Sequence, residues 1–369
     1  MNLLLVCRSF NNMAGGVERM GTALMNEMCR RGHEVSLLTW DRSEAEAFYK
    51  FDERIAWHCL DMGDYMKKAG WGLRFKRARW VRRLVKKLKP DVILAFQHGT
   101  FLSTRLFTYG LGIPTIAAER NAPSRFDHLQ VGRYRNLIFQ TFRLAQRITI
   151  QCESYCNEYP AYLRSRIVTI PNPVFPAQSH ACPQGEPGEQ KTLLSIGRLS
   201  YQKNYFVLIR AFAVLCKDFP QWRLVIAGEG EDRKRLEAEI AESGLSDKVT
   251  LPGATDDVGS LYSQSHLLCL PSLWEGFPNV LAEALSHGLP GVGFAGCAGV
   301  RDLIQHGENG LLAEGNGNME SLAGCLRTLM ADDEKRVRMG EAGIRSMKAY
   351  NPEQIFDTWE KFLKETAAL

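Results

Sequence analysis

Along the chain, short runs of apolar residues alternate with amphipathic stretches in which apolar residues recur with a helical period. Near the N-terminus the apolar run Leu3–Cys7 predicts a buried strand, and apolar residues then recur at helical spacing from Val17 to Met28. Glu34–Trp40 predicts the next strand, so this segment reads as a β-α-β unit. Repeated units of this kind imply a parallel sheet covered by helices on both faces.

The alternation continues in two series. The first series contains further predicted strands at Val92–Phe96, Pro114–Ala118, Ile148–Gln151 and Ile167–Ile170. The second contains predicted strands at Thr192–Ile196, Trp222–Ala227, Val249–Leu251, His266–Leu270 and Gly291–Ala295. Between the two series, residues 171–190 hold five prolines and two glycines, a composition typical of a linker.

We therefore predict an α/β protein of two Rossmann-like domains, each with a doubly wound parallel sheet. The predicted boundaries are 1–172 for the first domain, 173–190 for the linker, 191–350 for the second domain and 351–369 for a C-terminal helix that packs back toward the first domain. A length of 369 residues suits two domains. Ligands of such domains bind at the carboxyl ends of the strands, which predicts a site in a central cleft between them.

The distribution of charged residues indicates a candidate binding surface. The net charge of +5 is unevenly spread, because residues 1–172 hold 27 Lys and Arg against 15 Asp and Glu, whereas the remainder holds 19 against 26. Lys67–Lys89 alone holds eleven Lys or Arg and no acid, interleaved with apolar residues at helical spacing. This pattern suits a basic amphipathic helix on an anionic membrane. A core-packing helix with a solvated basic face and a nucleic-acid patch are the two alternatives.

Other features point to the cytoplasm. No apolar run of about 18 or more residues predicts a transmembrane helix, and the N-terminus lacks the pattern of a signal peptide. Most of the ten cysteines stand alone, as expected of buried thiols in a reducing compartment. We expect a cytoplasmic protein that is peripheral on the inner face of the cell membrane.

One run after the predicted strand His266–Leu270 carries two acids. Glu275 lies on the turn after that strand, and Pro278 suits the first turn of a helix, where its missing N–H costs nothing. The free N–H groups near Phe277–Val280 would form an anion site. Glu283 follows on the same helix face as Asn279, and sugar or ribose hydroxyls would satisfy its carboxylate. The alternative is a solvated glutamate.

A second run follows the strand Thr192–Ile196. Arg198 and Lys203 lie on this strand-to-helix loop. Arg offers a planar fork of donors and Lys a compact charge, so the two together suit a diphosphate. A solvated basic loop is the alternative for the pair taken alone.

These runs resemble family 4 of the retaining glycosyltransferases, which have the GT-B fold. The resemblance rests on GRL-x3-KN around Arg198 and Lys203, AGEGED at 227–232, LPG at 251–253, and the E-x7-E spacing of Glu275 and Glu283. It extends to IPNPV at 170–174, a glycine pair in the first domain, and Gly299-x2-Asp302-x7-Gly310-Leu311.

The resemblance implies a role for each matching residue. Arg198 and Lys203 would bind the donor diphosphate, Glu275 the donor sugar and Glu283 the ribose. The other donor-binding positions would be Gly15, Gly16, Gly228, Gly230, Gly253, Gly276, Phe277, Pro278, Asn279 and Val280. Many members of the family place a histidine after a first-domain strand, near the reacting carbon. Arg120 occupies that position here and joins Arg198, Lys203 and Glu275 as a catalytic candidate; His98 is a nearby alternative.

Other short motifs in the sequence bear on the choice of cofactor. Gly291-x-Gly293-x-x-Gly296 matches the dinucleotide fingerprint by letter, but it lies within and after a strand, and no clear helix is predicted at its end. A Walker A motif, HExxH and a D-x-D triplet are absent from the sequence. We therefore expect cationic side chains and helix N-termini to neutralise the diphosphate, with no metal or other cofactor required.

The predicted function is retaining transfer of a hexosyl or N-acetylhexosaminyl group. The donor would be a nucleoside-diphosphate sugar, and the acceptor a phosphorylated or lipid-linked glycan in bacterial polysaccharide or lipopolysaccharide assembly. A nucleotide-sugar epimerase of the same fold and a basic nucleic-acid-binding protein are the alternatives. The sequence leaves open the donor base (UDP, GDP or ADP), the sugar, the linkage and the oligomeric state.

Overall fold

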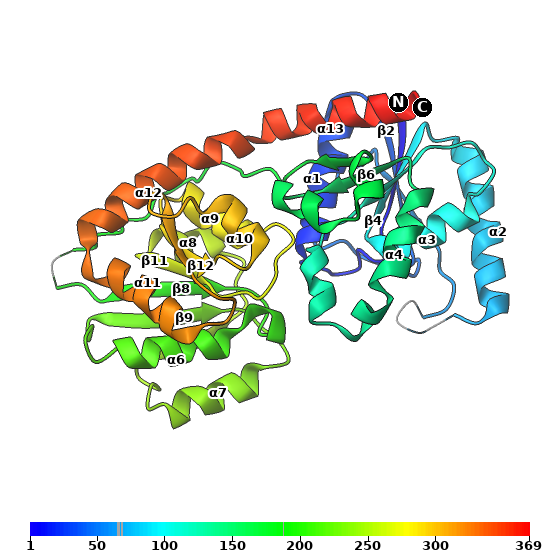
Figure 1. Cartoon of the computed structure of the whole chain (residues 1–369). Coiled ribbons are helices and arrows are strands. Elements are labelled where there is room, and N and C mark those ends of the chain that lie inside the picture. The colour runs from blue at the N-terminus through cyan, green and yellow to red at the C-terminus, as the bar shows by residue number, and fades with distance from the viewer. Residues whose placement is uncertain (65–66, 68, 187) are drawn as a thin grey trace. The chain divides into compact units, whose positions relative to one another are not determined.

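The computed structural model describes residues 1–64, 67, 69–186 and 188–369. The chain forms two compact units: the first contains Met1–Asn172 and Glu353–Leu369, and the second contains Pro173–Pro352. Each unit is built on one parallel sheet with helices packed on both faces (Figure 1). The predicted fold class of two doubly wound parallel sheets is confirmed.

The first unit has a seven-stranded sheet in the order β3-β2-β1-β4-β5-β6-β7, with every pairing parallel. Its strands are β1 (Asn2–Val6), β2 (Glu34–Thr39), β3 (Ala56–Cys59), β4 (Val92–Phe96), β5 (Thr115–Ala118), β6 (Arg147–Ile150) and β7 (Ile167–Thr169). The central strands are apolar runs buried on both faces, as expected in a sheet covered on both sides. The strand order reverses between β1 and β4, which makes their carboxyl ends a topological switch point.

Helices cover both faces of this sheet. They are α1 (Gly16–Arg30), α2 (Trp71–Leu88), α3 (His98–Phe107), α4 (Arg135–Thr141), α5 (Ala161–Arg164) and α13 (Pro352–Ala367). Short 3-10 turns lie at η1 (Pro123–Asp127), η2 (Gln130–Tyr134), η3 (Phe142–Leu144) and η4 (Glu153–Glu158). Residues of α1 and α13 share one hydrophobic cluster with β1, β2 and β4, so both helices pack on the same face of the sheet (Figure 1).

Helix α13 completes the first unit although it comes last in the chain. Its buried residues Ile355, Phe356, Trp359, Phe362 and Leu363 belong to the hydrophobic cluster of the first unit. Ion pairs reinforce this packing, because the guanidinium of Arg31 at the end of α1 contacts both Asp357, at 2.6 Å, and Glu360, at 2.8 Å.

The second unit has a six-stranded parallel sheet in the order β10-β9-β8-β11-β12-β13. Its strands are β8 (Lys191–Ile196), β9 (Trp222–Ala227), β10 (Val249–Gly253), β11 (Leu267–Leu270), β12 (Gly291–Phe294) and β13 (Gly310–Ala313). Its helices are α6 (Tyr205–Leu215), α7 (Arg233–Glu242), α8 (Val258–Ser263), α9 (Asn279–Ser286), α10 (Ala298–Leu303), α11 (Met319–Ala331) and α12 (Asp333–Met347), with 3-10 turns η5 (Tyr201–Lys203) and η6 (Lys348–Tyr350).

The proline-rich segment 173–190 is counted with the second unit and is tied to it by hydrogen bonds. The backbone N–H of Ala181 donates to the carbonyl of His287 at 2.8 Å, and Nε of Arg336 donates to the carbonyl of Pro183 at 2.7 Å. The described residues of this segment therefore pack along the second unit on their way to β8.

Three local features differ from the prediction. Strands β3 and β13, of four residues each, were missed because both are short and β13 begins with a glycine. The expectation that no helix follows Gly296 was wrong, because α10 begins two residues later, at Ala298. Gly291 and Gly293 nevertheless lie within β12, where backbones approach closely: a Cβ on Gly310 of β13 would lie 2.3 Å from the carbonyl oxygen of Gly291.

Candidate active site

The switch point of the second sheet brings two predicted residues together. Strands β8 and β11 are neighbours there, and the chain leaves them in loops that carry Lys203 and Glu275 respectively. Nζ of Lys203 donates to Oε1 of Glu275 at 2.6 Å. The side chains are only 14% and 9% exposed, so water screens this ion pair weakly. The pair therefore lies where open α/β sheets bind their ligands.

Polar contacts fix the two loops relative to each other. Gln202, beside Lys203, donates from Nε2 to the carbonyl of Trp274 at 2.7 Å, and its own carbonyl accepts from the N–H of Leu273 at 2.9 Å. Asn316, after β13, donates to the carbonyl of Leu273 at 2.9 Å. Neither Gln202 nor Asn316 was predicted as a site residue, because an isolated amide side chain carries no sequence signal.

Glycines allow the loops after β8 and β9 to touch through their backbones. Gly197 has φ +153°, and a Cβ on it would lie 2.8 Å from Cε of Lys203. A Cβ on Gly228 would lie 2.0 Å from the carbonyl oxygen of Gly197, and one on Gly230 would lie 2.2 Å from that of Leu199. Any side chain at 228 or 230 would collide with backbone, so glycine is required at both positions.

Arg198 lies in the same loop as Lys203 but differs from it in environment. It is exposed, and its guanidinium makes no hydrogen bond or ion pair with the described residues. Its five donors are therefore available to a ligand. The structure thus places one paired and one unpaired cation in the loop after β8.

The carboxylate of Glu275 influences its neighbours. Burial raises the pKa of the Cys297 thiol to about 12, and the negative charge of Glu275 adds to this rise. Burial also raises the pKa of the Tyr205 phenol, again with a contribution from Glu275. Both groups therefore stay protonated at neutral pH.

Helix α9 presents Glu283 one turn beyond its first residue. Oε2 of Glu283 accepts a hydrogen bond from the phenol of Tyr262 at 3.0 Å, and the glutamate is half-buried. The carboxylate therefore has a protein donor, which sequence reasoning missed because Tyr262 lies in a different element, α8. Asn279 and Val280, in the first turn of α9, are half-buried.

The start of α9 offers fewer free N–H groups than expected. The N–H of Asn279 donates to the carbonyl of Phe277 at 2.9 Å, and those of Leu281 and Ala282 donate to the carbonyl of Pro278. Phe277 is buried, and its ring centroid lies 5.7 Å from that of Tyr350 with the two ring planes tilted by 59°. Gly276 is half-buried beside Glu275. We therefore expect this end of α9 to position the residues of the site and to shape it, more than to supply free N–H donors.

Gly253 is the last residue of β10, the edge strand that pairs with β9. It adopts φ +93°, and a Cβ on it would lie 3.0 Å from Oε1 of Glu229. Glu229 in turn forms a bidentate pair with Arg233, at 2.7 and 2.8 Å. Gly253, one of the predicted donor-binding positions, thus borders an acidic side chain that is already paired.

In the first unit, Gly15 and Gly16 lie at the beginning of α1 as predicted, with Gly15 as its N-cap. The buried side chain of Glu18 lies over this end of the helix, since a Cβ on Gly15 would meet its Oε2 at 2.2 Å. A phosphate reaching these N–H groups would meet that carboxylate.

Arg120 and His98 lie at the carboxyl ends of β5 and β4. Arg120 is buried, and its Cζ lies 5.3 Å from the ring centroid of Phe96 and 5.0 Å from that of Trp359. Nε2 of His98 lies 2.7 Å from Oγ1 of Thr141, and burial lowers the pKa of the imidazole. His98 is therefore a neutral, hydrogen-bonded residue at the start of α3.

The basic segment Lys67–Lys89 forms helix α2 over residues 71–88, and Lys68 lies outside the described residues. Its sheet-facing side is narrow: Arg77, Val81 and Val85 are buried. Trp71 and Phe75 are 85% and 69% exposed, so they lie outside this buried side. The helix therefore presents two large aromatic side chains among its cations to solvent.

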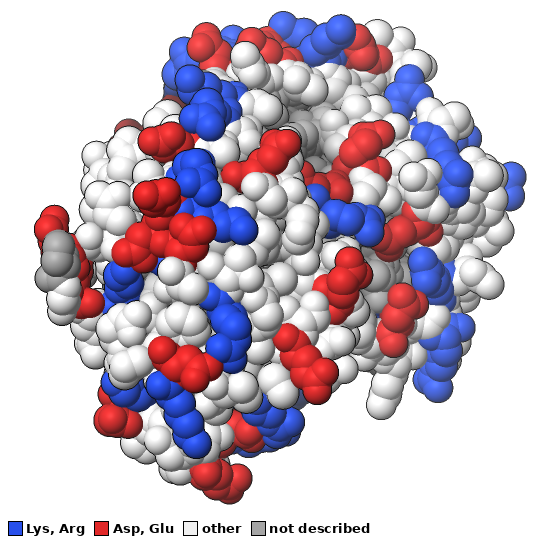
Figure 2. All heavy atoms as spheres, turned by 60° about the vertical axis from the view of Figure 1, so that its left-hand side comes forward, with Lys and Arg blue, Asp and Glu red and all other residues white. Residues whose placement is uncertain are grey.

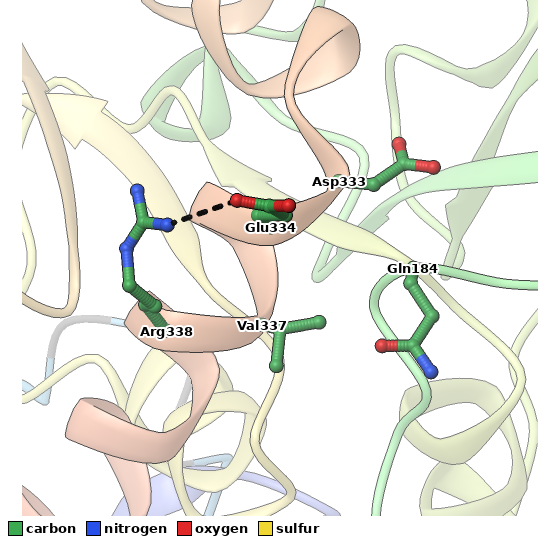
Figure 3. Close-up of a pocket in the computed structure, with 5 residues that line it drawn as sticks. All are labelled: Gln184, Asp333, Glu334, Val337 and Arg338. Carbon is green, nitrogen blue, oxygen red and sulfur yellow. Dashed lines mark ion pairs between the residues drawn. The ribbon is translucent and has the colours of Figure 1, made fainter.

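A separate hollow lies on the second unit beside α12. It is lined by Gln184, Asp333, Glu334, Val337 and Arg338, and the ion pair between Glu334 and Arg338 spans 3.6 Å (Figure 3). None of the predicted site residues lines it.

Among the described residues, no group of three or more His, Cys, Asp and Glu side chains is arranged to hold a metal ion. No helix among the same residues is long and apolar enough to cross a membrane. The face drawn in Figure 2 intersperses Lys and Arg with Asp and Glu, so that face carries no broad basic patch.

Comparison with known families accounts for nearly the whole chain. Residues 14–178 match the model described as Glycosyltransferase Family 4, and residues 179–346 match Glycosyl transferases group 1. A solved sucrose-phosphate synthase from Thermosynechococcus elongatus superimposes with a TM-score of 0.82 at 18% identity, covering 100% of this chain and 99% of that one.

Two relatives align over almost their full lengths. An uncharacterized glycosyltransferase of Haemophilus influenzae is 29% identical over 95% of this chain and 96% of its own. A Campylobacter jejuni protein is 27% identical over 99% of each chain. Its name is GalNAc-alpha-(1->4)-GalNAc-alpha-(1->3)-diNAcBac-PP-undecaprenol alpha-1,4-N-acetyl-D-galactosaminyltransferase.

Proposed function

The chain belongs to the family 4-type glycosyltransferases of the GT-B fold, and from this premise we propose that it transfers a sugar from a nucleoside-diphosphate sugar with retention of configuration. The acceptor in this proposal is a lipid-linked or phosphorylated glycan used in assembling a bacterial surface polysaccharide or lipopolysaccharide. The similarity to the Campylobacter enzyme, whose named acceptor carries a diphosphate-undecaprenol group, supports this setting.

The observation that carries the proposal is the ion pair of Lys203 and Glu275 at the switch point of the second sheet. The pair leaves a cation and a carboxylate side by side, with the unpaired guanidinium of Arg198 in the same loop. Cations suit the diphosphate of a donor, and a carboxylate suits the hydroxyls of its sugar. Together, these cations and this carboxylate match a nucleoside-diphosphate sugar better than they match a diphosphate alone or a sugar alone.

In the proposed reaction the bond between the anomeric carbon and the diphosphate oxygen breaks. The acceptor oxygen bonds to the same face of that carbon, and its proton passes to the departing phosphate oxygen. Arg198 and Lys203 would stabilise the charge that develops on the diphosphate. Glu275 would orient the sugar through its hydroxyls, and Glu283, held by Tyr262, would orient the ribose. No metal ion is required in this proposal.

Helix α2 is the proposed membrane contact, and the protein is proposed to be a peripheral cytoplasmic enzyme. Trp71 and Phe75 are exposed among cations, and a core-packing role explains only the buried residues Arg77, Val81 and Val85. Aromatic side chains favour the membrane interface, and Lys and Arg favour anionic headgroups. The same arrangement would bring a lipid-linked acceptor to the enzyme.

A thermal-shift screen of UDP-, GDP- and ADP-sugars tests the donor. A ligand at 100 times its Kd stabilises the folded protein by about 2.7 kcal/mol, which is readily seen as a rise in Tm. One base should stabilise the wild type and should stabilise Lys203→Ala much less. If no nucleoside-diphosphate sugar shifts the wild type, the proposed donor class is wrong.

Product analysis separates this proposal from its alternatives. With the stabilising donor and a lipid-diphosphate acceptor, NMR of the product should show the donor's own anomeric configuration. An epimerase would convert the donor without an acceptor. A nucleic-acid-binding protein would bind oligonucleotides with an affinity that falls steeply with salt, and would ignore the donor.

A further inference from the structure

Arg120 follows directly after β5, at the carboxyl edge of the first sheet. Its side chain is only 5% exposed, yet Nε, Nη1 and Nη2 all lack a hydrogen-bond partner among the described residues. The neighbouring carboxylate of Glu119 does not pair with it, since Glu119 contacts Arg125 at 3.3 Å instead. A buried guanidinium without acceptors is uncommon, because burial removes the water that would otherwise bind its donors.

Aromatic rings hold this guanidinium in place. Its Cζ lies 5.3 Å from the ring centroid of Phe96, at the end of β4, and 5.0 Å from that of Trp359, on α13. Both aromatic residues are completely buried. The rings stabilise a cation through their faces but offer no acceptor for its N–H groups.

A second buried arginine in the same chain shows what a purely structural arrangement looks like. Arg336 on α12 is fully buried, and its Cζ lies 5.0 Å from the ring centroid of Trp222, so its stacking matches that of Arg120. Its guanidinium, however, is supplied with four acceptors: the carbonyls of Pro183, Leu329 and Met330 and the carboxylate of Asp333. Arg120 has the aromatic contact without any of these acceptors.

The charge of Arg120 survives its burial. Desolvation lowers the pKa of the guanidinium to about 9, which still leaves it protonated at neutral pH. Nε1 of Trp359 is a second buried donor without a partner among the described residues. Both groups are donors only, so their complement is an oxygen-rich acceptor, and the positive charge selects an anionic one.

We propose that Arg120, positioned by Phe96 and Trp359, binds a diphosphate oxyanion of a substrate. This inference rests on the proposed function, which supplies two such groups: the leaving diphosphate of the donor and the diphosphate of a lipid-linked acceptor. Both present the same chemistry to a guanidinium, which forms short charge-assisted hydrogen bonds to phosphate oxygens. Phe96 and Trp359 are positioning residues, because they set the plane of the guanidinium without offering the ligand an acceptor.

The proposal predicts that replacing Arg120 raises the stability of the protein and weakens its binding of diphosphates. Arg120→Met removes a buried guanidinium that has no hydrogen-bond partner among the described residues, and it keeps an apolar side chain of similar length. Replacing an unsatisfied buried charge in this way stabilises a protein, and a rise in Tm of about 2–4 °C is expected. Arg336→Met is the matched control: it removes the guanidinium donor from the carbonyls of Pro183 and Leu329, so its Tm should fall.

Three probes identify the source of the oxyanion. Isothermal titration calorimetry, at a temperature at which every variant is folded, would measure the affinity of the protein for three probes. These are inorganic pyrophosphate, the nucleoside diphosphate that best stabilises the wild type, and farnesyl diphosphate. Arg120→Met should weaken at least one of them tenfold or more, whereas Arg336→Met should weaken none. Loss of nucleoside-diphosphate affinity alone assigns Arg120 to the donor, and loss of farnesyl diphosphate affinity alone assigns it to the acceptor. Arg120→Lys should keep part of the affinity.

Trp359 provides the test of positioning. Trp359→Phe retains an aromatic face and should keep the affinity of the affected probe within about threefold, whereas Trp359→Leu should lose it. The inference is overturned if Arg120→Met binds all three probes within twofold of the wild type, or lowers Tm as Arg336→Met does. A wild type that ignores nucleoside-diphosphate sugars contradicts the proposed function instead, and the other two probes then still decide the role of Arg120.

Discussion

Lys203 and Glu275 are 72 positions apart in the chain, yet Nζ of one lies 2.6 Å from Oε1 of the other, across the switch point of the second sheet. The contact joins the loops that follow β8 and β11. The two side chains form an ion pair in a largely buried place. Neither can therefore be removed without leaving an opposite charge behind.

This coupling gives the first prediction. Lys203→Ala should lower stability by about 3 kcal/mol, because breaking a buried ion pair leaves an uncompensated charge. Glu275→Ala should do the same, and the double variant should lose much less than the sum of the two single losses. Chemical unfolding of all four proteins measures this cycle. Strict additivity would show that the two side chains do not interact in solution.

Arg198 is expected to behave differently because it has no protein partner. Arg198→Ala should reduce turnover by about a hundredfold, the usual loss when one charge-assisted contact to a transition-state charge is removed. Its Tm should stay within about 1 °C of the wild type, as expected for an exposed side chain. Lys217→Ala is the control for activity and stability, because Lys217 is another exposed cation of the second unit with no ion pair among the described residues. Equal turnover in both variants would remove Arg198 from the donor site.

Replacing Glu275 and replacing Glu283 should change different kinetic constants. Glu275→Ala should mainly lower kcat, because contacts to the transferred sugar can tighten in the transition state. Glu283→Ala should mainly raise the donor KM, because ribose changes little during the reaction. Tyr262→Phe removes the hydrogen bond to Glu283 and should raise the same KM by a smaller factor. Steady-state kinetics of the three variants checks this, and a reversed pattern would exchange the proposed roles.

Membrane attachment through α2 can be tested by charge reversal. Four exposed cations of the helix would be changed to glutamate: Lys76, Arg79, Arg83 and Lys86. The wild type should sediment with anionic liposomes at low salt, and less so as salt shortens the Debye length from about 30 Å at 0.01 M to about 8 Å at 0.15 M. The variant should stay in the supernatant with an unchanged Tm, since these side chains are solvated.

A matched control reverses four exposed cations of the second unit: Lys217, Lys234, Arg301 and Lys348. That protein carries the same change in net charge and should still sediment. If it is released as completely as the α2 variant, total charge rather than the helix governs the attachment.

Acid should loosen the junction between α1 and α13. Hydrogen bonds from Lys364 and Arg31 hold the pKa of Glu360 at about 2, below its ordinary value of 4.5. Since the folded-state pKa is depressed, the stabilisation is complete above the unfolded pKa and is lost as pH falls from about 4.5 toward 2. Glu360→Gln should therefore lower Tm at pH 7 and much less at pH 3. An equal difference at both pH values would contradict this.

Much of the fold was predictable because its signals are local. Buried parallel strands are continuous apolar runs, and β1, β4, β8 and β11 show this pattern clearly. Strands β3 and β13 were missed because a run of four residues with a polar or glycine position lies below what periodicity can detect. Helical spacing left two interpretations open for the segment around Trp71, because it shows which residues share a face but not whether that face packs on the core; Trp71 is 85% exposed.

The candidate site was predictable only in part, for a physical reason. Arg198, Lys203, Glu275 and Glu283 stand in motifs with a fixed local spacing. Their partners do not: the hydrogen bond from Tyr262 to Glu283 arises from packing between separate elements. The surroundings of Arg120 show this most clearly, because Trp359 lies at the far end of the chain and reaches it only through the packing of α13.

The late position of α13 affects how the protein is made. During synthesis an N-terminal domain commonly folds while later residues are still being added, at about 5–20 residues per second. Here the first unit cannot close its core at that stage, because Ile355, Phe356, Trp359 and Phe362 are synthesised after the whole second unit. The second unit, whose residues are contiguous, can finish folding before these residues appear, although it starts later. The apolar surface of the first unit that α13 covers must therefore stay open until the second unit has been synthesised.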